Sequence, residues 1–242
     1  MECREEKNYI VLELNEPPGN SLKISVLKKL YQDMKMAEEE KKFQGVILVS
    51  CNKNTFSSGL DLGELMSKSK WKTRLGIVYS VWLVHKLATF IVNSNKIYVA
   101  GAEGAVIGSA VTLFAACDQR IGTEHTWFWI PDPQYGGLLA DGGIELLRNL
   151  CGITNAGKIC LTNKRVQAEE ARQWGLLHQV VKHKDLTEYC DNYSEKLLHY
   201  SYDTLKHTKH ILNQELRLKF HVIRILKSVF SKEMMRRLKV YF

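Results

Sequence analysis

Two apolar runs, each followed by a turn of small residues that leads toward a helix, constrain the fold of this chain most. The runs cover residues 45–50 and 96–100, and the turns after them cover residues 55–62 and 101–110. A continuous apolar run is typical of a strand covered on both faces. Small residues let the backbone approach a ligand closely, and the first N–H groups of a helix have no carbonyl of that helix to bond. The pattern therefore predicts an α/β fold with two places where backbone N–H groups can hold an oxyanion.

The rest of the chain alternates strands and helices in the same way. Further strands are predicted at residues 9–14, 119–122 and 127–130, and helices from residue 24, from about residue 75 and over about 107–116. From about residue 142 onward the pattern is nearly all helical. The repeated ββα order predicts parallel sheet layers covered by helices, followed by a helical extension.

Length and composition exclude several classes of protein. With 242 residues, the chain has room for one large domain with a helical appendage. A content of 45% hydrophobic and 25% charged residues excludes disorder as the main state. No apolar run approaches the roughly 18 to 20 residues of a membrane span, and the charged start resembles neither a secretory signal nor a transit peptide. We therefore expect a folded protein without a membrane span.

The net charge of +8 points to a polyanionic partner, which is nucleic acid, a membrane surface or a small phosphorylated ligand. The basic, amphipathic tail over residues 216–242 is compatible with a membrane-surface helix. Because its basic residues are interspersed, we expect it instead to pack on its own domain or on a neighbouring subunit. Six scattered cysteines without a Cys-x-x-Cys pair predict neither disulfides nor a metal site, and favour a reducing compartment.

The order of several short motifs resembles one known family. The motifs are FSSGLD (56–61), AVIGSA (105–110), ACDQRI (116–121), LTNK (161–164), AEEA (168–171) and WGLL (174–177). Together they resemble the crotonase (enoyl-CoA hydratase/isomerase) superfamily over about residues 9–209, and most of all its peroxisomal-type Δ3,Δ2-enoyl-CoA isomerases. The resemblance implies a crotonase/ClpP-like spiral of ββα units. It also implies a core over residues 1–190, a C-terminal helical region over 191–242 that helps to build trimers, and a homotrimer or dimer of trimers.

The resemblance also implies a site for an acyl-CoA thioester. In this family the thioester carbonyl lies between two backbone N–H groups, which fall here on Ser58 and Ser109. Further substrate contacts are implied for Lys53, Phe56, Ser57, Gly59, Leu60, Asp61 and Gly108, with Lys53 placed to meet a phosphate of coenzyme A. Coenzyme A is part of the substrate, so no separate cofactor and no metal are expected. The resemblance thereby makes coenzyme A the polyanionic partner that the net charge of +8 suggests, and we expect no nucleic-acid partner.

The acids decide which reaction such a site performs. Hydratases of the family use two glutamates, and the first falls here on Thr112, which cannot act as a carboxylate base. Asp141 matches the single catalytic acid of the isomerases, and we place it first, although an aspartate there also suits a helix N-cap. Asp132, between two prolines, ranks second as a catalytic acid or is a turn residue. One acid suffices to move a double bond.

The sequence therefore favours a Δ3,Δ2-enoyl-CoA isomerase of fatty acid beta-oxidation, in the mitochondrial matrix, with the peroxisome or cytoplasm as other locations. The alternatives are an enoyl-CoA hydratase, an acyl-CoA hydrolase or dehalogenase-like enzyme in which Asp141 attacks as a nucleophile, and a non-catalytic acyl-CoA or protein-binding module. An RNA-binding role has only the net charge in its favour.

Overall fold

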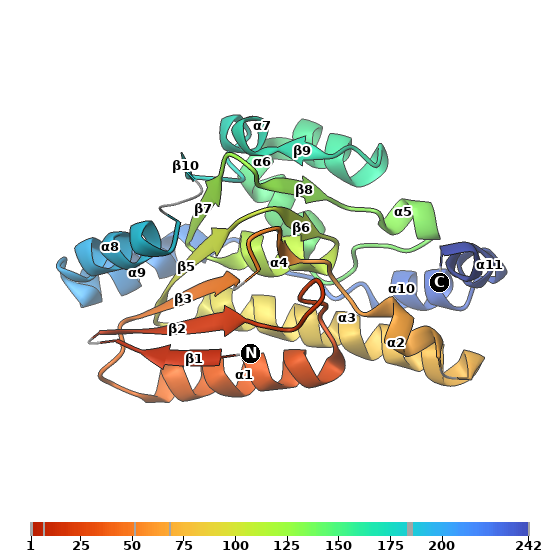
Figure 1. The fold of residues 1–242 in the computed structure, drawn as a ribbon, viewed down its shortest axis with the longest axis horizontal. Helices are drawn as coiled ribbons and strands as arrows, with labels where there is room; N and C mark the ends of the chain where they lie inside the picture. Colours follow the sequence, from red (N-terminus) through yellow and green to blue (C-terminus); the bar gives the residue numbers. More distant parts are fainter. Residues whose placement is uncertain (1, 7, 51, 68, 183–185, 242) are drawn as a thin grey trace.

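Two β-sheets form the centre of the fold (Figure 1). The computed structural model describes residues 2–6, 8–50, 52–67, 69–182 and 186–241. In spatial order the larger sheet contains β1 (Glu2–Glu5), β2 (Tyr9–Leu14), β3 (Gly45–Ser50), β5 (Ile97–Ala102), β7 (Gln119–Thr123) and β10 (Gln179–Val181). The smaller sheet contains β4 (Thr55–Ser57), β6 (Ala105–Ile107), β8 (Trp127–Trp129) and β9 (Val166–Gln167).

Helices connect and cover these strands (Figure 1). They are α1 (Ile24–Glu39), α2 (Leu62–Met66), α3 (Lys70–Asn93), α4 (Ser109–Ala116), α5 (Asp132–Tyr135), α6 (Gly143–Leu161), α7 (Ala168–Gln173), α8 (Leu186–Leu198), α9 (Tyr202–Asn213), α10 (Val222–Val229) and α11 (Lys232–Tyr241). Every residue of α4 is buried, because this short apolar helix packs against both α3 and α6. It forms the centre of the core, where Phe114 contacts the rings of Phe56 and Phe128.

The chain forms a spiral in which successive strands are shared between the two sheets. Strands β3, β5 and β7 are parallel neighbours in the larger sheet, and β4, β6 and β8 are parallel neighbours in the smaller one. Each ββα unit therefore adds one strand to each sheet, as the sequence pattern predicts. Because β4, β6 and β8 are parallel, their carboxyl ends meet at one edge of the smaller sheet, and the turns that follow them lie together.

Most predicted elements are confirmed, and the differences have local causes. Strands occur at residues 9–14, 45–50, 119–123 and 127–129. The helix predicted over about 107–116 begins only at Ser109, because residues 105–107 pair with β4 and β8 as strand β6. Strand β1, a charged edge strand held by antiparallel pairing with β2, was not predicted. Strands β9 and β10 were not predicted either, and they lie within the stretch predicted to be nearly all helical.

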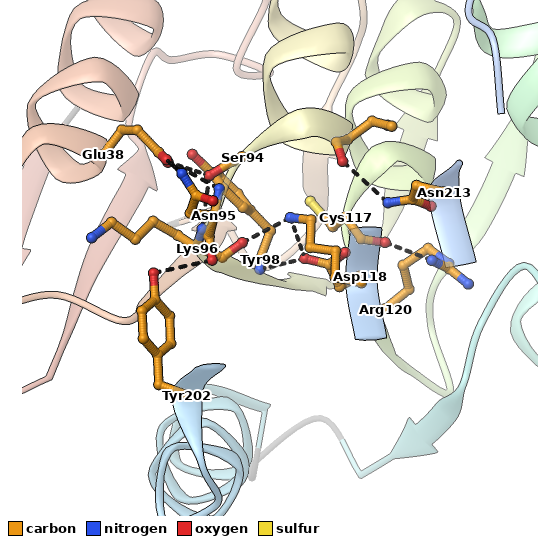
Figure 2. Close-up of polar contacts among 12 residues, drawn as sticks. Glu38, Ser94, Asn95, Lys96, Tyr98, Cys117, Asp118, Arg120, Tyr202 and Asn213 are labelled. Carbon is orange, nitrogen blue, oxygen red and sulfur yellow. Dashed lines mark hydrogen bonds and ion pairs between the residues drawn. The ribbon is translucent and has the colours of Figure 1, made fainter. Parts of the chain in front are cut away.

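A buried polar cluster attaches α9 to the core (Figure 2). Lys209 of α9 lies 2.8 Å from the carboxylate of Asp118 and donates to the carbonyl of Lys96 at 2.7 Å. The same carboxylate accepts the backbone N–H of Tyr98 at 2.8 Å. Burial raises the pKa of Asp118, against the lowering effect of Lys209. The predicted helical C-terminal region is present, and the boundary predicted at residue 190 falls inside α8.

Among the described residues, one helix, α3, is long and apolar enough by length and composition to cross a membrane. Half of its most apolar segment is buried in the fold. The described cysteines are Cys3, Cys117, Cys151, Cys160 and Cys190, and all five are free thiols. Cys51 lies outside the described residues.

Candidate active site

Three turns meet at the carboxyl edge of the smaller sheet and surround a cavity of about 190 Å³. Residues 58–60 follow β4, residues 108–109 follow β6, and residues 131–132 follow β8 shortly after its end. The register aligns Ser57 with Val106 and Ile107 with Trp129, so the three strands end at nearly the same level. Segments that are about fifty and seventy residues apart in the sequence thus line one cavity.

The first two turns are in direct backbone contact, and glycines allow it. Gly59 has a φ of +81°, and a Cβ there would lie 2.7 Å from the carbonyl oxygen of Ile107 and 3.7 Å from the nitrogen of Ser109. Gly108 has a φ of +56°, which also favours glycine. Both positions therefore require glycine, and the backbone N–H groups of the two turns come close together at the cavity.

The predicted pair of N–H donors is only partly available. The N–H of Ser58 donates to the carbonyl of Gly19 at 2.9 Å and is therefore already bonded. Leu60, two residues further on, also lines the cavity, and its N–H donates to no atom of the described residues. Ser109 lines the cavity as the first residue of α4, so its N–H has no carbonyl within that helix to bond. The two backbone N–H donors at the cavity are therefore those of Leu60 and Ser109, and not those of Ser58 and Ser109.

Asp132 places a carboxylate at this cavity. It lines the cavity wall at the start of α5, and a Cβ at Gly108 would lie 3.8 Å from its Oδ2 atom. Burial and the nearby carboxylate of Asp141 raise the pKa of Asp132 to about 7. A carboxyl group with this pKa exchanges protons readily at neutral pH, as a general acid or base does.

Asp141 lies behind the cavity, fully buried. Its carboxylate accepts the hydroxyl protons of Ser109 at 2.7 Å and Thr112 at 2.8 Å, and the backbone N–H of Gly143 at 3.1 Å. Burial raises its pKa despite these three hydrogen bonds, each of which lowers it. Because α4 and α6 pack together, the side chain of Asp141 points at the first turn of α4, and Asp141 is absent from the cavity lining.

The other residues implied by the resemblance divide into two groups. Gly59, Leu60 and Gly108 line the cavity together with Ser58 and Ser109. Phe56 and Ser57 are fully buried in the core beneath the first turn, where the Ser57 hydroxyl donates to the carbonyl of Asn20 at 2.7 Å. Asp61 caps α2 by accepting the N–H of Glu64 at 2.8 Å. Lys53 is exposed in the loop between β3 and β4.

The residues that form the apolar wall of the cavity were not predicted from the sequence. It comes from α3 with Ile77 and Val81, and from the C-terminal helices with Ile225, Val229 and Met234. The C-terminal residues lie 84 to 93 positions after Asp141, the nearest catalytic candidate, and no local motif marks them. The amphipathic pattern of the tail is the one sequence signal that these helices bury an apolar face, and it does not indicate against what.

Among the described residues, no group of three or more His, Cys, Asp or Glu side chains is placed to hold a metal ion. The arrangement that remains is a carboxylate of raised pKa, two adjacent backbone N–H groups and an apolar wall. It suits acid-base chemistry on a substrate that develops negative charge on an oxygen atom.

Comparison with known proteins identifies the family. The family model for enoyl-CoA hydratase/isomerase matches residues 4–237, and the chain belongs to this family. Its fold is the crotonase fold, since the enoyl-CoA hydratase of Bacillus halodurans superposes with a TM-score of 0.88 at 21% identity, covering 99% of this chain and 98% of that one. An enoyl-CoA hydratase/isomerase from Xanthobacter autotrophicus Py2 gives a TM-score of 0.84 at 23% identity, covering 98% and 91%.

Relatives in sequence carry several different activities in their names. The trans-2-decenoyl-[acyl-carrier-protein] isomerase of Streptococcus mutans is 26% identical over 210 residues, or 86% of this chain and 80% of the relative. The 2,3-dehydroadipyl-CoA hydratase of Escherichia coli is 27% identical over 211 residues, with the same coverage of 86% and 80%. A glyoxysomal fatty acid beta-oxidation multifunctional protein of Brassica napus is 29% identical over 179 residues, 73% of this chain. The chain spans about a quarter of that protein, as the matched 24% of its length indicates.

Proposed function

We propose that this protein is an enoyl-CoA delta isomerase, which moves the double bond of an unsaturated acyl-CoA thioester from the 3,4 to the 2,3 position. The observation that carries the proposal is that, among the described residues, a single carboxylate lines the cavity. Asp132 lies beside Gly108 with its pKa raised to about 7, whereas Asp141 is sealed behind Ser109. One acid that both takes and returns a proton is sufficient for isomerisation, and hydration by the family's two-acid mechanism needs a second.

In the proposed mechanism the thioester oxygen accepts hydrogen bonds from the N–H groups of Leu60 and Ser109. The carboxylate of Asp132 takes a proton from C2, and the electron pair shifts to give a dienolate with its negative charge on that oxygen. The same carboxyl group then returns the proton at C4, which leaves the double bond between C2 and C3. Loss of one such N–H donor costs about 3 to 4 kcal/mol in other oxyanion sites.

The role we propose for Asp141 is to position Ser109 and to set the charge at the site. Its hydrogen bonds to Ser109 and Thr112 fix the first turn of α4, which orients the Ser109 N–H toward the cavity. Its negative charge also raises the pKa of Asp132, which makes that carboxylate a stronger base. Asp132, ranked second from the sequence, thus becomes the base, and Asp141, ranked first, acts through its neighbours.

An acyl-CoA substrate fits the surroundings of these groups. The apolar side chains of α3 and of the C-terminal helices offer a wall for an acyl chain. Lys53 is exposed in the loop before β4, and we propose that it meets a phosphate of coenzyme A. This assignment uses part of the net charge of +8.

Hydration is the second candidate. A hydratase is among the sequence relatives, and two carboxylates do lie close enough for Asp141 to raise the pKa of Asp132. In that case Asp141 would have to gain access to a water molecule in the cavity.

The test is to incubate the protein with trans-3-enoyl-CoA and, separately, with trans-2-enoyl-CoA, and to follow the absorbance of the conjugated thioester. An isomerase raises the absorbance from the first substrate, while a hydratase lowers it from the second. Asp132→Asn should abolish isomerisation, and Asp141→Asn should retain a reduced rate. Activity lost only with Asp141→Asn would reverse the two roles, and an inactive parent protein would favour a binding module.

The homotrimer or dimer of trimers and the mitochondrial matrix location stay predictions. Neither is needed for the proposed chemistry, because every proposed catalytic group lies in one chain.

A further inference from the structure

Helices α3 and α10 contact each other and lie side by side (Figure 1), and two ring contacts show that they run in opposite directions. At one end, the ring of Trp71 in α3 contacts that of Phe230, just after α10, with a centroid distance of 5.2 Å. At the other end, the ring centre of His85 in α3 lies 5.7 Å from the ring centre of Phe220, just before α10. The inner faces of the two helices form much of the apolar wall of the cavity.

The outer faces of the same helices are also apolar. Seven large side chains there are between 37% and 67% exposed: Trp71, Leu75, Tyr79 and Trp82 of α3, and Val222, Ile223 and Leu226 of α10. We call these seven residues the α3–α10 face. The spacing of the four α3 residues places them in one stripe along the helix. Scattered single apolar residues are normal on a protein surface, but seven large apolar side chains on two contacting helices, three of them aromatic, mark an interaction site.

The charged side chains of α3, of α10 and of the segment just before α10 all have one sign, and Glu145 of α6 lies beside that segment, 2.7 Å from His221. Residues 70–93 and 216–230 contain no Asp or Glu, and their basic residues are Lys70, Lys72, Arg74, Lys86, Arg217, Lys219, Arg224 and Lys227. Helix α1 adds Lys28, whose ammonium group lies 5.6 Å from the ring centre of Tyr79. Lys86 lies 5.5 Å from the ring centre of Trp82, so the cations and the aromatic rings are interleaved.

We propose that the α3–α10 face docks on a membrane surface that contains anionic lipid. Tryptophan and tyrosine favour the boundary between lipid and water, and basic residues beside them attract anionic headgroups. Pairing of this face with the same face of a second copy would bring two sets of cations together, with no acid on either helix to pair with them. Exposed Leu, Ile and Val side chains favour lipid over RNA, since RNA recognition relies on stacking and charge.

Docking flat on the surface agrees with the packing of α3. Although this helix is long and apolar enough to span a bilayer, its inner face packs on α4 in the core. It therefore stays in the fold and presents only its outer stripe to lipid. Docking would set the apolar wall of the cavity directly above the membrane surface.

The inference does not depend on the proposed isomerase activity, because its test measures binding only. The full-length protein is mixed with vesicles of phosphatidylcholine alone, or of phosphatidylcholine with about 30% phosphatidylserine, and the fraction that sediments with the vesicles is measured. The test variant combines Ile223→Ser with Lys227→Glu on α10. The matched control combines Leu161→Ser with Lys158→Glu on α6, another exposed apolar and basic pair.

We expect the parent and the control to bind the anionic vesicles, and the test variant to bind at least tenfold less. Binding should also weaken when salt is raised from about 0.1 M to about 0.5 M. Equal thermal unfolding of the two variants shows that the test variant is folded. Absence of parent binding, or equal losses in both variants, overturns the proposal. Absence of vesicle binding together with RNA binding, or with an oligomer that the test variant alone disrupts, assigns the face to that other partner and equally overturns it.

Discussion

Replacing Asp132 by Asn should stabilise the fold at neutral and alkaline pH while it removes the proposed base. The pKa of Asp132 is raised from 3.8 to about 7 by burial and by Asp141, so the folded state holds its proton more tightly than the unfolded state. The stability that Asp132 contributes is therefore fully present below pH 3.8 and is lost as pH rises through about 7. At 1.36 kcal/mol per unit, a shift of this size costs about 4 kcal/mol above pH 8.

An Asn side chain avoids this cost because it never ionises. We expect urea unfolding to give nearly equal stabilities for the parent and Asp132→Asn near pH 4, and a variant that is more stable by up to about 4 kcal/mol at pH 8.5. The control is Asp203→Asn, at an exposed carboxylate of α9, which should show no such divergence. If the stability difference between the parent and Asp132→Asn does not grow between pH 4 and pH 8.5, the raised pKa is refuted, and with it the argument for Asp132 as a base at neutral pH.

Three further outcomes are expected. In the isomerase assay, Asp141→Asn should move the acidic limb of the pH–rate profile to lower pH, because it removes the negative charge that helps raise the pKa of Asp132; an unmoved limb would contradict that coupling. Gly59→Ala should lower kcat/KM at least tenfold, since its Cβ would lie 2.7 Å from the carbonyl oxygen of Ile107 and displace the turn that presents Leu60. Lys209→Met should destabilise the fold by about 3 to 5 kcal/mol in chemical unfolding, because it leaves the carboxylate of Asp118, only 16% exposed, without its ion-pair partner; a loss below about 1 kcal/mol would mean that water replaces the lysine.

The sequence predicted the parallel core of the fold well because local patterns specify it. The apolar run at residues 45–50 and the small-residue turns appear in the structure as strands followed by close backbone contacts. Strand β1 was not predicted, since its charged residues pair with β2 at an edge and no local pattern reveals that partner. Strands β9 and β10 are only two and three residues long, too short for a periodic signal.

The candidate site was predicted in its parts but not in its arrangement. Both Asp132 and Asp141 were identified from the sequence, in the reverse order of their access to the cavity. The Ser58 N–H was assigned to the substrate, yet it bonds the carbonyl of Gly19, which the chain places against it from a distant turn. Ser58 and Leu60 both line the cavity, on either side of Gly59 with its positive φ, and among the described residues the N–H of Leu60 has no acceptor.

The sequence by itself determined the ββα repetition, the glycine turns, the absence of a carboxylate at position 112 and the presence of two nearby candidate acids. Only the tertiary structure decided which acid faces the cavity. That choice depends on the packing of α6 against α4, which turns Asp141 toward Ser109 and Thr112 and leaves Asp132 at the cavity. The tertiary structure also determines the apolar wall of the cavity, because residues 77–81 and 225–234 become neighbours only when the C-terminal helices fold back on α3.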